Sequence, residues 1–164
     1  MSADRSRLPA PGPRRIFIFP TIEKSTLPNG LRVWVIRQAT VPLVTCLLLL
    51  RTGSANDPAG KDGLAALTVD MLDEGSGQRS AIDMHEALAR IGAQFDADAG
   101  YDGSALSITL LSRFVERGLM LVADMVSRPS LAEADFSRVR QLRLHRLTVI
   151  IHGVDVQGDR ATGQ

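Results

Sequence analysis

The sequence contains one cysteine, Cys46, among its 164 residues. A single thiol excludes an internal disulfide framework and any zinc site built from clustered thiolates. Phe, Trp and Tyr make up only 4% of the residues, and the formal net charge is +1. The chain therefore lacks both the aromatic platforms and the basic field that favour nucleic-acid binding, and we expect no nucleic-acid partner.

Long hydrophobic runs are also missing. The longest apolar run covers residues 41–50 and is interrupted by Pro42 and Thr45, whereas a membrane-spanning helix needs about 20 apolar residues. The N-terminal residues are charged and proline-rich, and no apolar stretch of signal-peptide length follows them. We therefore expect no membrane partner and, by default, a cytoplasmic location; a start codon further upstream would leave a periplasmic location open.

The sequence does contain a regular succession of predicted strands and helices. Asn29-Gly30 favours a β-hairpin turn between strands over residues 24–27 and 31–37. The run after Val41 is predicted as a strand buried on both faces, with Cys46 as a small core residue. Further strands are predicted around residues 95–99 and 106–110, and helices over residues 62–74, 80–92, 112–126 and 130–147. This order predicts an α+β fold, a largely antiparallel or mixed sheet with helices packed on one face.

Three segments are predicted along the chain. Residues 1–20 contain four prolines, which favour extended backbone, and are predicted to form an N-terminal arm. Residues 21–150 carry the regular pattern and form the predicted domain. Residues 151–164 lose the apolar periodicity, and we predict a disordered tail there.

Few residues could carry chemistry, and they are scattered. The three histidines, His85, His145 and His152, include no pair on a shared helix face. A zinc site needs three or four converging ligands, which this pattern does not provide. Asp70, Asp73 and Glu74 form an acidic patch late in the first helix, where carboxylates oppose the helix dipole. A solvated polar face is the favoured interpretation of this patch, and a functional role stays open.

Glycines after the first helix suggest a phosphate-binding loop only superficially. Gly75-Ser76-Gly77 lacks the following Lys-Ser/Thr pair of such a loop and follows a helix, where a phosphate-binding loop follows a strand. We therefore predict a simple connection between two helices.

A family resemblance emerges when these segments are taken together. Residues 63–80 resemble the zinc-binding helix of the insulinase/pitrilysin-type metallopeptidases, the inverted zincins, in which Gly-Leu-Ala is followed by H-x-x-E-H, Met-Leu and a glycine. The hairpin TLPNGLRVWVI, the strand VPLVTCLLLL and the later stretch ALARIGAQFDADAGYDGSALSITLL are similar to the segments that surround that helix. The resemblance covers residues 21 to about 150 and implies the N-terminal peptidase-like domain of this family.

The zinc-binding motif itself departs from the family pattern. Ala66 stands at the first histidine position, Val69 at the position of the general-base glutamate, and Asp70 at the second histidine position. The family's third zinc ligand is a glutamate on a later helix, but residues 142–147 contain Arg143, His145 and Arg146 and no carboxylate. The resemblance therefore implies a non-catalytic subclass, with no catalytic residue, no metal ligand and no cofactor. Loss of the base alone costs about 10²–10⁴ in rate.

The resemblance also implies a role and a partner. Some members of the family lack the zinc motif and pair with a zinc-bearing homologous subunit, so that the two enclose a chamber for unfolded or short peptides. We expect the same here, in a domain that stops after its fourth helix and is therefore truncated. Two alternatives stay open: a zinc metalloendopeptidase with a relocated site that uses Asp70, Asp73, Glu74 or His85, and an inactive fragment.

Overall fold

The computed structural model describes residues 12, 16 and 18–161, with the backbone alone over 151–161. The arm predicted over residues 1–20 therefore falls largely outside the described residues. The chain forms two compact units, Met1–Val41 and Pro42–Gln164. No helix in the described part of the chain combines the length and the hydropathy needed to cross a membrane.

The first unit contains the predicted β-hairpin. Strands β1 (Ile22–Thr26) and β2 (Arg32–Ile36) pair antiparallel, and Lys24 lies opposite Trp34 with its Nζ 4.5 Å from the ring centroid. Gly30 has φ +86° and donates its N–H to the carbonyl oxygen of Leu27. The positive φ is one that glycine adopts at little cost, which explains why Asn-Gly marked the turn.

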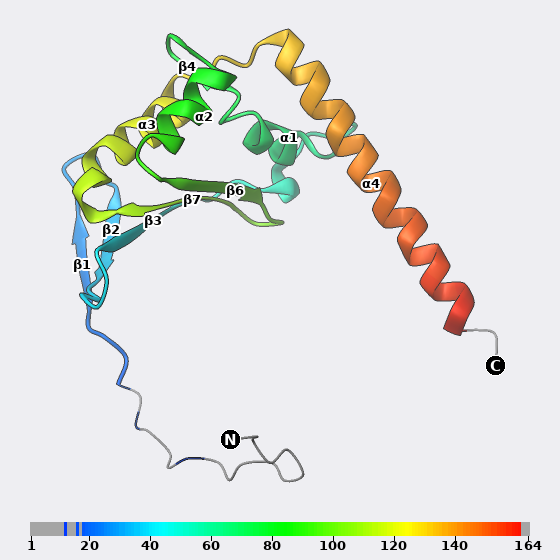
Figure 1. The fold of residues 1–164 in the computed structure, drawn as a ribbon. Helices are drawn as coiled ribbons and strands as arrows, with labels where there is room; N and C mark the ends of the chain where they lie inside the picture. The colour runs from blue at the N-terminus through cyan, green and yellow to red at the C-terminus, as the bar shows by residue number, and fades with distance from the viewer. Residues whose placement is uncertain (1–11, 13–15, 17, 162–164) are drawn as a thin grey trace, which may run out of the picture. The chain divides into compact units, whose positions relative to one another are not determined.

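The second unit is a three-stranded antiparallel sheet with helices on one face (Figure 1). The strand order is β3-β7-β6, so β7 is central and β3 and β6 form the two edges. The α+β prediction is confirmed. The elements of this unit are β3 (Leu43–Leu50), η1 (Ser54–Asn56), α1 (Leu64–Asp70), β4 (Gly75–Ser76), β5 (Arg79–Ser80), α2 (Ala81–Ala89), β6 (Gln94–Ala99), β7 (Ser104–Leu111), η2 (Ser112–Phe114), α3 (Val115–Ser127) and α4 (Glu133–Ala161).

The core lies between the central strand and helices α2 and α3. Alternate residues of β7 point into it, and each of these side chains is only 1% exposed: Leu106, Ile108 and Leu110. Gly118 lets α3 approach the sheet closely, because a Cβ at this position would lie 2.9 Å from a Leu110 methyl group. The period-2 pattern of the predicted strand is therefore the pattern that builds the core.

The prediction that β3 is buried on both faces is wrong. Alternate side chains of the strand are exposed, and Leu47 and Leu49 are 59% and 67% exposed. The helices cover only the other face, where Cys46 packs against the core as a half-buried side chain, and burial raises the pKa of its thiol. A continuous apolar run fixes a strand but does not say which of its faces a helix covers.

The first helix ends earlier than its apolar spacing predicts. Helix α1 stops at Asp70, and the chain then turns through Met71 and Leu72, which are buried, toward Gly75 at φ +114°. The predicted helix–helix connection is a short hairpin, β4–β5, in which a Cβ at Gly75 would lie 2.8 Å from the carbonyl oxygen of Arg79. Asp73 and Glu74 consequently lie in a turn, and the helix-dipole argument applies to Asp70 alone.

The last helix is longer than predicted. Helix α4 continues to Ala161, where the sequence pattern predicted a disordered tail from residue 151. The extension contains no proline, and its glycines each lower helix propensity by only about 1 kcal/mol relative to alanine. Loss of apolar periodicity removes the packed face of a helix and leaves its backbone hydrogen bonds intact.

Candidate functional site

Helix α1 carries the motif positions and is fixed at its N-terminus by Asp57. One carboxylate oxygen of Asp57 accepts the N–H of Gly63 at 2.8 Å, and the other accepts the N–H of Ala65, also at 2.8 Å. These two bonds satisfy N–H groups that a helix start leaves unpaired. The helix packs against the edge strand β6 on one side and α4 on the other (Figure 1).

The three motif positions differ in their exposure. Ala66 and Val69 are buried, at 7% and 4% exposed, while Asp70 is partly exposed at the end of the helix. Neither buried side chain has an atom that could bind a metal or accept a proton. Asp70 is therefore the one motif position with ligand chemistry.

Two arginines from α4 reach the acidic groups at the end of α1. Arg143 Nη1 lies 2.6 Å from Asp70 Oδ2, and both side chains are partly buried. Arg138 forms an ion pair with Glu74 and a second with Asp135 at 3.2 Å. The structure thus identifies Arg143 as the α4 side chain that meets the second histidine position. The sequence pattern favoured a solvated polar face for the acidic patch. In the structure, two of its members, Asp70 and Glu74, instead form ion pairs with arginines.

The third member of the patch has a different neighbour. His85 Nε2 on α2 lies 3.8 Å from Asp73 Oδ2. Burial raises the pKa of Asp73, and the nearby histidine partly opposes that effect. Of the residues of the alternative relocated site, Asp70 and Glu74 are thus paired with arginines of α4, while Asp73 and His85 lie near each other. Across the described residues no three His, Cys, Asp or Glu side chains converge in a way that could hold a metal ion.

A cleft of about 220 Å³ lies between the end of α1, strand β6 and helix α4. Its walls are acidic on the α1 and β6 sides and basic on the α4 side, with apolar side chains between them. The lining residues are Val69, Asp70, Asp73, Glu74, Phe95, Asp96, Ala97, Val139, Leu142, Arg143 and Arg146. His145 is exposed on α4, and the side chain of His152 lies outside the described residues.

Sequence reasoning named Asp70, Glu74 and Arg143 but missed how they pair. Asp70 and Glu74 are four residues apart, and Arg138 and Arg143 are five apart on α4. This matching spacing of acidic and basic residues would indicate the two ion pairs, but only if α1 and α4 were already known to be neighbours. Asp57 was also missed, because its capping bonds cross a loop of several residues.

The arrangement of the sheet and the helices is that of a two-layer α+β domain. The structure matches the crystal structure described as a peptidase M16 inactive domain from Pseudomonas fluorescens with a TM-score of 0.69 and 24% identity, over 74% of this chain and 30% of that chain. The family model described as Insulinase (Peptidase family M16) matches residues 32–150. This chain belongs to the insulinase family, peptidase family M16.

Two curated relatives bear on function. An uncharacterized zinc protease of Rickettsia bellii is 27% identical over 75% of this chain and 30% of its own length. The mitochondrial-processing peptidase subunit beta of Mus musculus is 26% identical over 88% of this chain and 29% of its own length. The chain therefore spans about a third of the length of these relatives.

The ion pair between Asp70 and Arg143 makes a first prediction. We expect Arg143→Met to lower the free energy of unfolding by about 1 kcal/mol, because it leaves a partly buried carboxylate without its partner. Asp70→Asn combined with Arg143→Met should cost less than the sum of the two single changes. Urea denaturation of the four proteins measures this coupling. Arg140→Met, on the exposed surface of α4, is the control and should change little; strictly additive effects at 70 and 143 would contradict the pairing.

Proposed function

We propose that this chain is a non-catalytic domain of the insulinase family that pairs with a zinc-bearing homologous subunit to form a peptide-degrading chamber. The observation that carries the proposal is the state of the motif on α1: Ala66, Val69 and an Asp70 that is paired with Arg143. The peptide substrates are unfolded or short, and the partner subunit supplies the zinc.

The residues on α1 do not fit the zinc that the family implies. Such a site uses two histidines on one helix face, a further protein ligand and a glutamate that deprotonates the metal-bound water. Ala66 and Val69 have no donor or base to offer. A guanidinium 2.6 Å from Asp70 places a positive charge where a cation would bind. No hydrolytic step is therefore assigned to this chain.

The same contacts weigh against the alternative of a relocated metallopeptidase site. Such a site would require Asp70 and Glu74 to release Arg143 and Arg138, and to approach Asp73 and His85. Giving up these partly exposed ion pairs without replacement partners is unfavourable. The geometry thus favours a structural use of these acids over a catalytic one.

Two findings support the pairing. Mitochondrial-processing peptidase subunit beta is, by its name, a subunit of a larger enzyme. The present chain exposes large apolar side chains on the open face of β3 and along α4, which is typical of surfaces that another polypeptide covers. They include Leu43, Leu47, Leu49, Leu142, Leu144, Leu147, Val149 and Ile150.

A reconstitution experiment tests the proposal. The chain and a zinc-bearing family member from the same genome are purified separately and mixed, and hydrolysis of a quenched-fluorescent peptide is measured. We expect hydrolysis in the mixture well above that of either protein alone, abolished by a chelator or by loss of the partner's first zinc-binding histidine. Asp70→Asn in this chain should leave the activity of the mixture nearly unchanged. Zinc-dependent hydrolysis by this chain alone, lost in Asp70→Asn, would overturn the proposal.

A further inference from the structure

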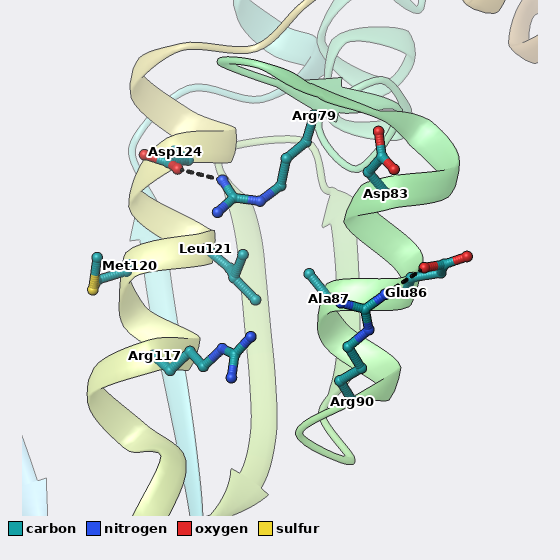
Figure 2. A pocket seen from close by; sticks show the side chains of 9 residues that line it. All are labelled: Arg79, Asp83, Glu86, Ala87, Arg90, Arg117, Met120, Leu121 and Asp124. Carbon is teal, nitrogen blue, oxygen red and sulfur yellow. Dashed lines mark hydrogen bonds and ion pairs between the residues drawn. The ribbon is translucent and has the colours of Figure 1, made fainter.

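A second cleft, away from the motif helix, lies between α2 and α3 and has a volume of about 340 Å³ (Figure 2). This volume is at the lower end of the range for sites that bind small molecules. Its floor contains the apolar side chains Ala87 and Leu121, and charged side chains from β5, α2 and α3 form the walls. The lining residues are Arg79, Asp83, Glu86, Ala87, Arg90, Arg117, Met120, Leu121 and Asp124.

Arg117 is the feature of this cleft that internal pairing does not explain. Its guanidinium extends from α3 into the space between the two helices (Figure 2). Among the residues that the structure describes, it has no hydrogen-bond or ion-pair partner. A guanidinium offers five donors in a planar fork that matches the two oxygens of a carboxylate.

The acidic groups of the cleft are already engaged elsewhere. Asp83 accepts hydrogen bonds from the N–H and hydroxyl of Ser80 as a helix cap, and its carboxylate points away from α3. Glu86 pairs with Arg90 at 2.8 Å and turns toward the outer side of α2. These carboxylates are therefore not aimed at Arg117.

The remaining carboxylate is shared by two arginines. Asp124 lies 3.1 Å from Arg79 Nη1 and 2.5 Å from Arg128 Nη2, and this contact with Arg128 is the main reason why the pKa of Asp124 is lowered. Three arginines and three carboxylates line the cleft, and each of these carboxylates already accepts hydrogen bonds from another group. The exposed guanidinium of Arg117 is therefore the lining group whose donors are left for an anion.

We propose that the α2–α3 cleft binds a peptide carboxylate, with the guanidinium of Arg117 as its ligand. The carboxylate is either the C-terminus of a peptide or an acidic side chain, since both present the same two oxygens. The apolar floor at Ala87 and Leu121 would contact the adjoining aliphatic atoms. This proposal is independent of zinc, of the α1–α4 cleft and of the pairing proposed above.

Three short peptides test the proposal and separate its two sources. Ac-Ala-Ala-Ala-Ala-OH carries only a C-terminal carboxylate, Ac-Ala-Ala-Glu-Ala-NH2 only a side-chain carboxylate, and Ac-Ala-Ala-Gln-Ala-NH2 neither. Binding is followed by NMR titration of the arginine Nε–H signals at low ionic strength, where charge interactions are least screened. We expect one or both carboxylate peptides to bind and the Gln peptide not to bind.

Two variants separate a specific site from general positive charge. Arg117→Met should weaken the binding of the carboxylate peptide about tenfold or more, because a charge-assisted bidentate contact is lost. Arg140→Met removes the same charge from the exposed surface of α4 and should leave binding unchanged. The proposal fails if neither carboxylate peptide binds better than the Gln peptide, or if the two variants weaken binding equally.

Discussion

The chain with Ala66→His, Asp70→His and Arg143→Glu is expected to bind zinc at least ~100-fold more tightly than the unmodified chain, since it gains three ligands of the types that zinc prefers. Residues 66 and 70 lie one helical turn apart on α1, so two histidines there share a face. The Arg143 guanidinium already reaches Asp70 at 2.6 Å, which places residue 143 opposite that face. Zinc content after dialysis and a competition titration with a chromogenic chelator measure the effect.

The matched control for this variant is Ala66→His, Asp70→His and Arg140→Glu. It makes the same changes on α1 and the same change of charge on α4, but on the exposed surface of α4. We expect it to bind zinc more weakly than the variant with Arg143→Glu, because the third ligand is missing and Arg143 stays near the site. Circular dichroism must show that both are folded, since a histidine at the buried position 66 can overpack α1.

This experiment separates two reasons why the motif would not bind zinc: the identity of its side chains and the backbone geometry of α1 and α4. If the folded variant with three ligands binds zinc no better than its control, the backbone geometry of α1 and α4, and not the identity of the side chains, prevents binding. Stoichiometric zinc in the unmodified chain, lost on Asp70→Ala, would likewise contradict the non-catalytic assignment.

The parts of the fold that depend on local pattern were predictable. The alternation of Leu106, Ile108 and Leu110 predicted the central strand and its buried face, and Asn29-Gly30 predicted the hairpin. The helix predicted from residue 80 is α2, whose N-cap is Ser80 and whose two capping hydrogen bonds with Asp83 are present. In each case the signal and the structure that it specifies lie within a few residues of one another.

Features set by distant contacts were not predictable from the pattern. The hairpin that follows α1 depends on Gly75, which has no room for a side chain beside the backbone of Arg79. The open face of β3 depends on which side of the sheet the helices occupy. The pairing of Asp70 with Arg143 joins residues 73 positions apart, so the sequence could identify the altered motif but not what neutralises it.

The loop after β3 carries the largest expected effect on stability, at Gly53. A Cβ on Gly53 would lie 2.5 Å from the carbonyl oxygens of both Gly100 and Tyr101, and 2.6 Å from the N–H nitrogen of Gly103. The φ of Gly53 is −136°, so the constraint is space and not backbone conformation. All three crowding atoms belong to the backbone of the β6–β7 turn and cannot move aside as a side chain would.

The same backbone also holds the end of β3 to that turn. Ser54 and Ala55 donate their N–H groups to the carbonyl oxygens of Gly100 and Tyr101, at 3.0 and 2.9 Å. The hydroxyl of Ser104 donates to the carbonyl oxygen of Thr52 at 2.7 Å. Moving the loop to admit a methyl group would lengthen these bonds, so relief of the clash costs hydrogen bonds.

We therefore expect Gly53→Ala to lower the free energy of unfolding by about 3 kcal/mol, at the upper end of the range for overpacking, and to lower Tm by roughly 10 °C. Gly30→Ala is the informative control, because position 30 has open space around it but φ +86°. It should cost only about 1 kcal/mol, the usual penalty of the left-handed region for a residue with a Cβ. Guanidinium denaturation of both variants measures the difference. Equal losses of unfolding free energy in the two variants would mean that the β6–β7 turn moves to admit the methyl group. The contact between Gly53 and that turn would then not fix the end of β3 or the path of the chain toward α1.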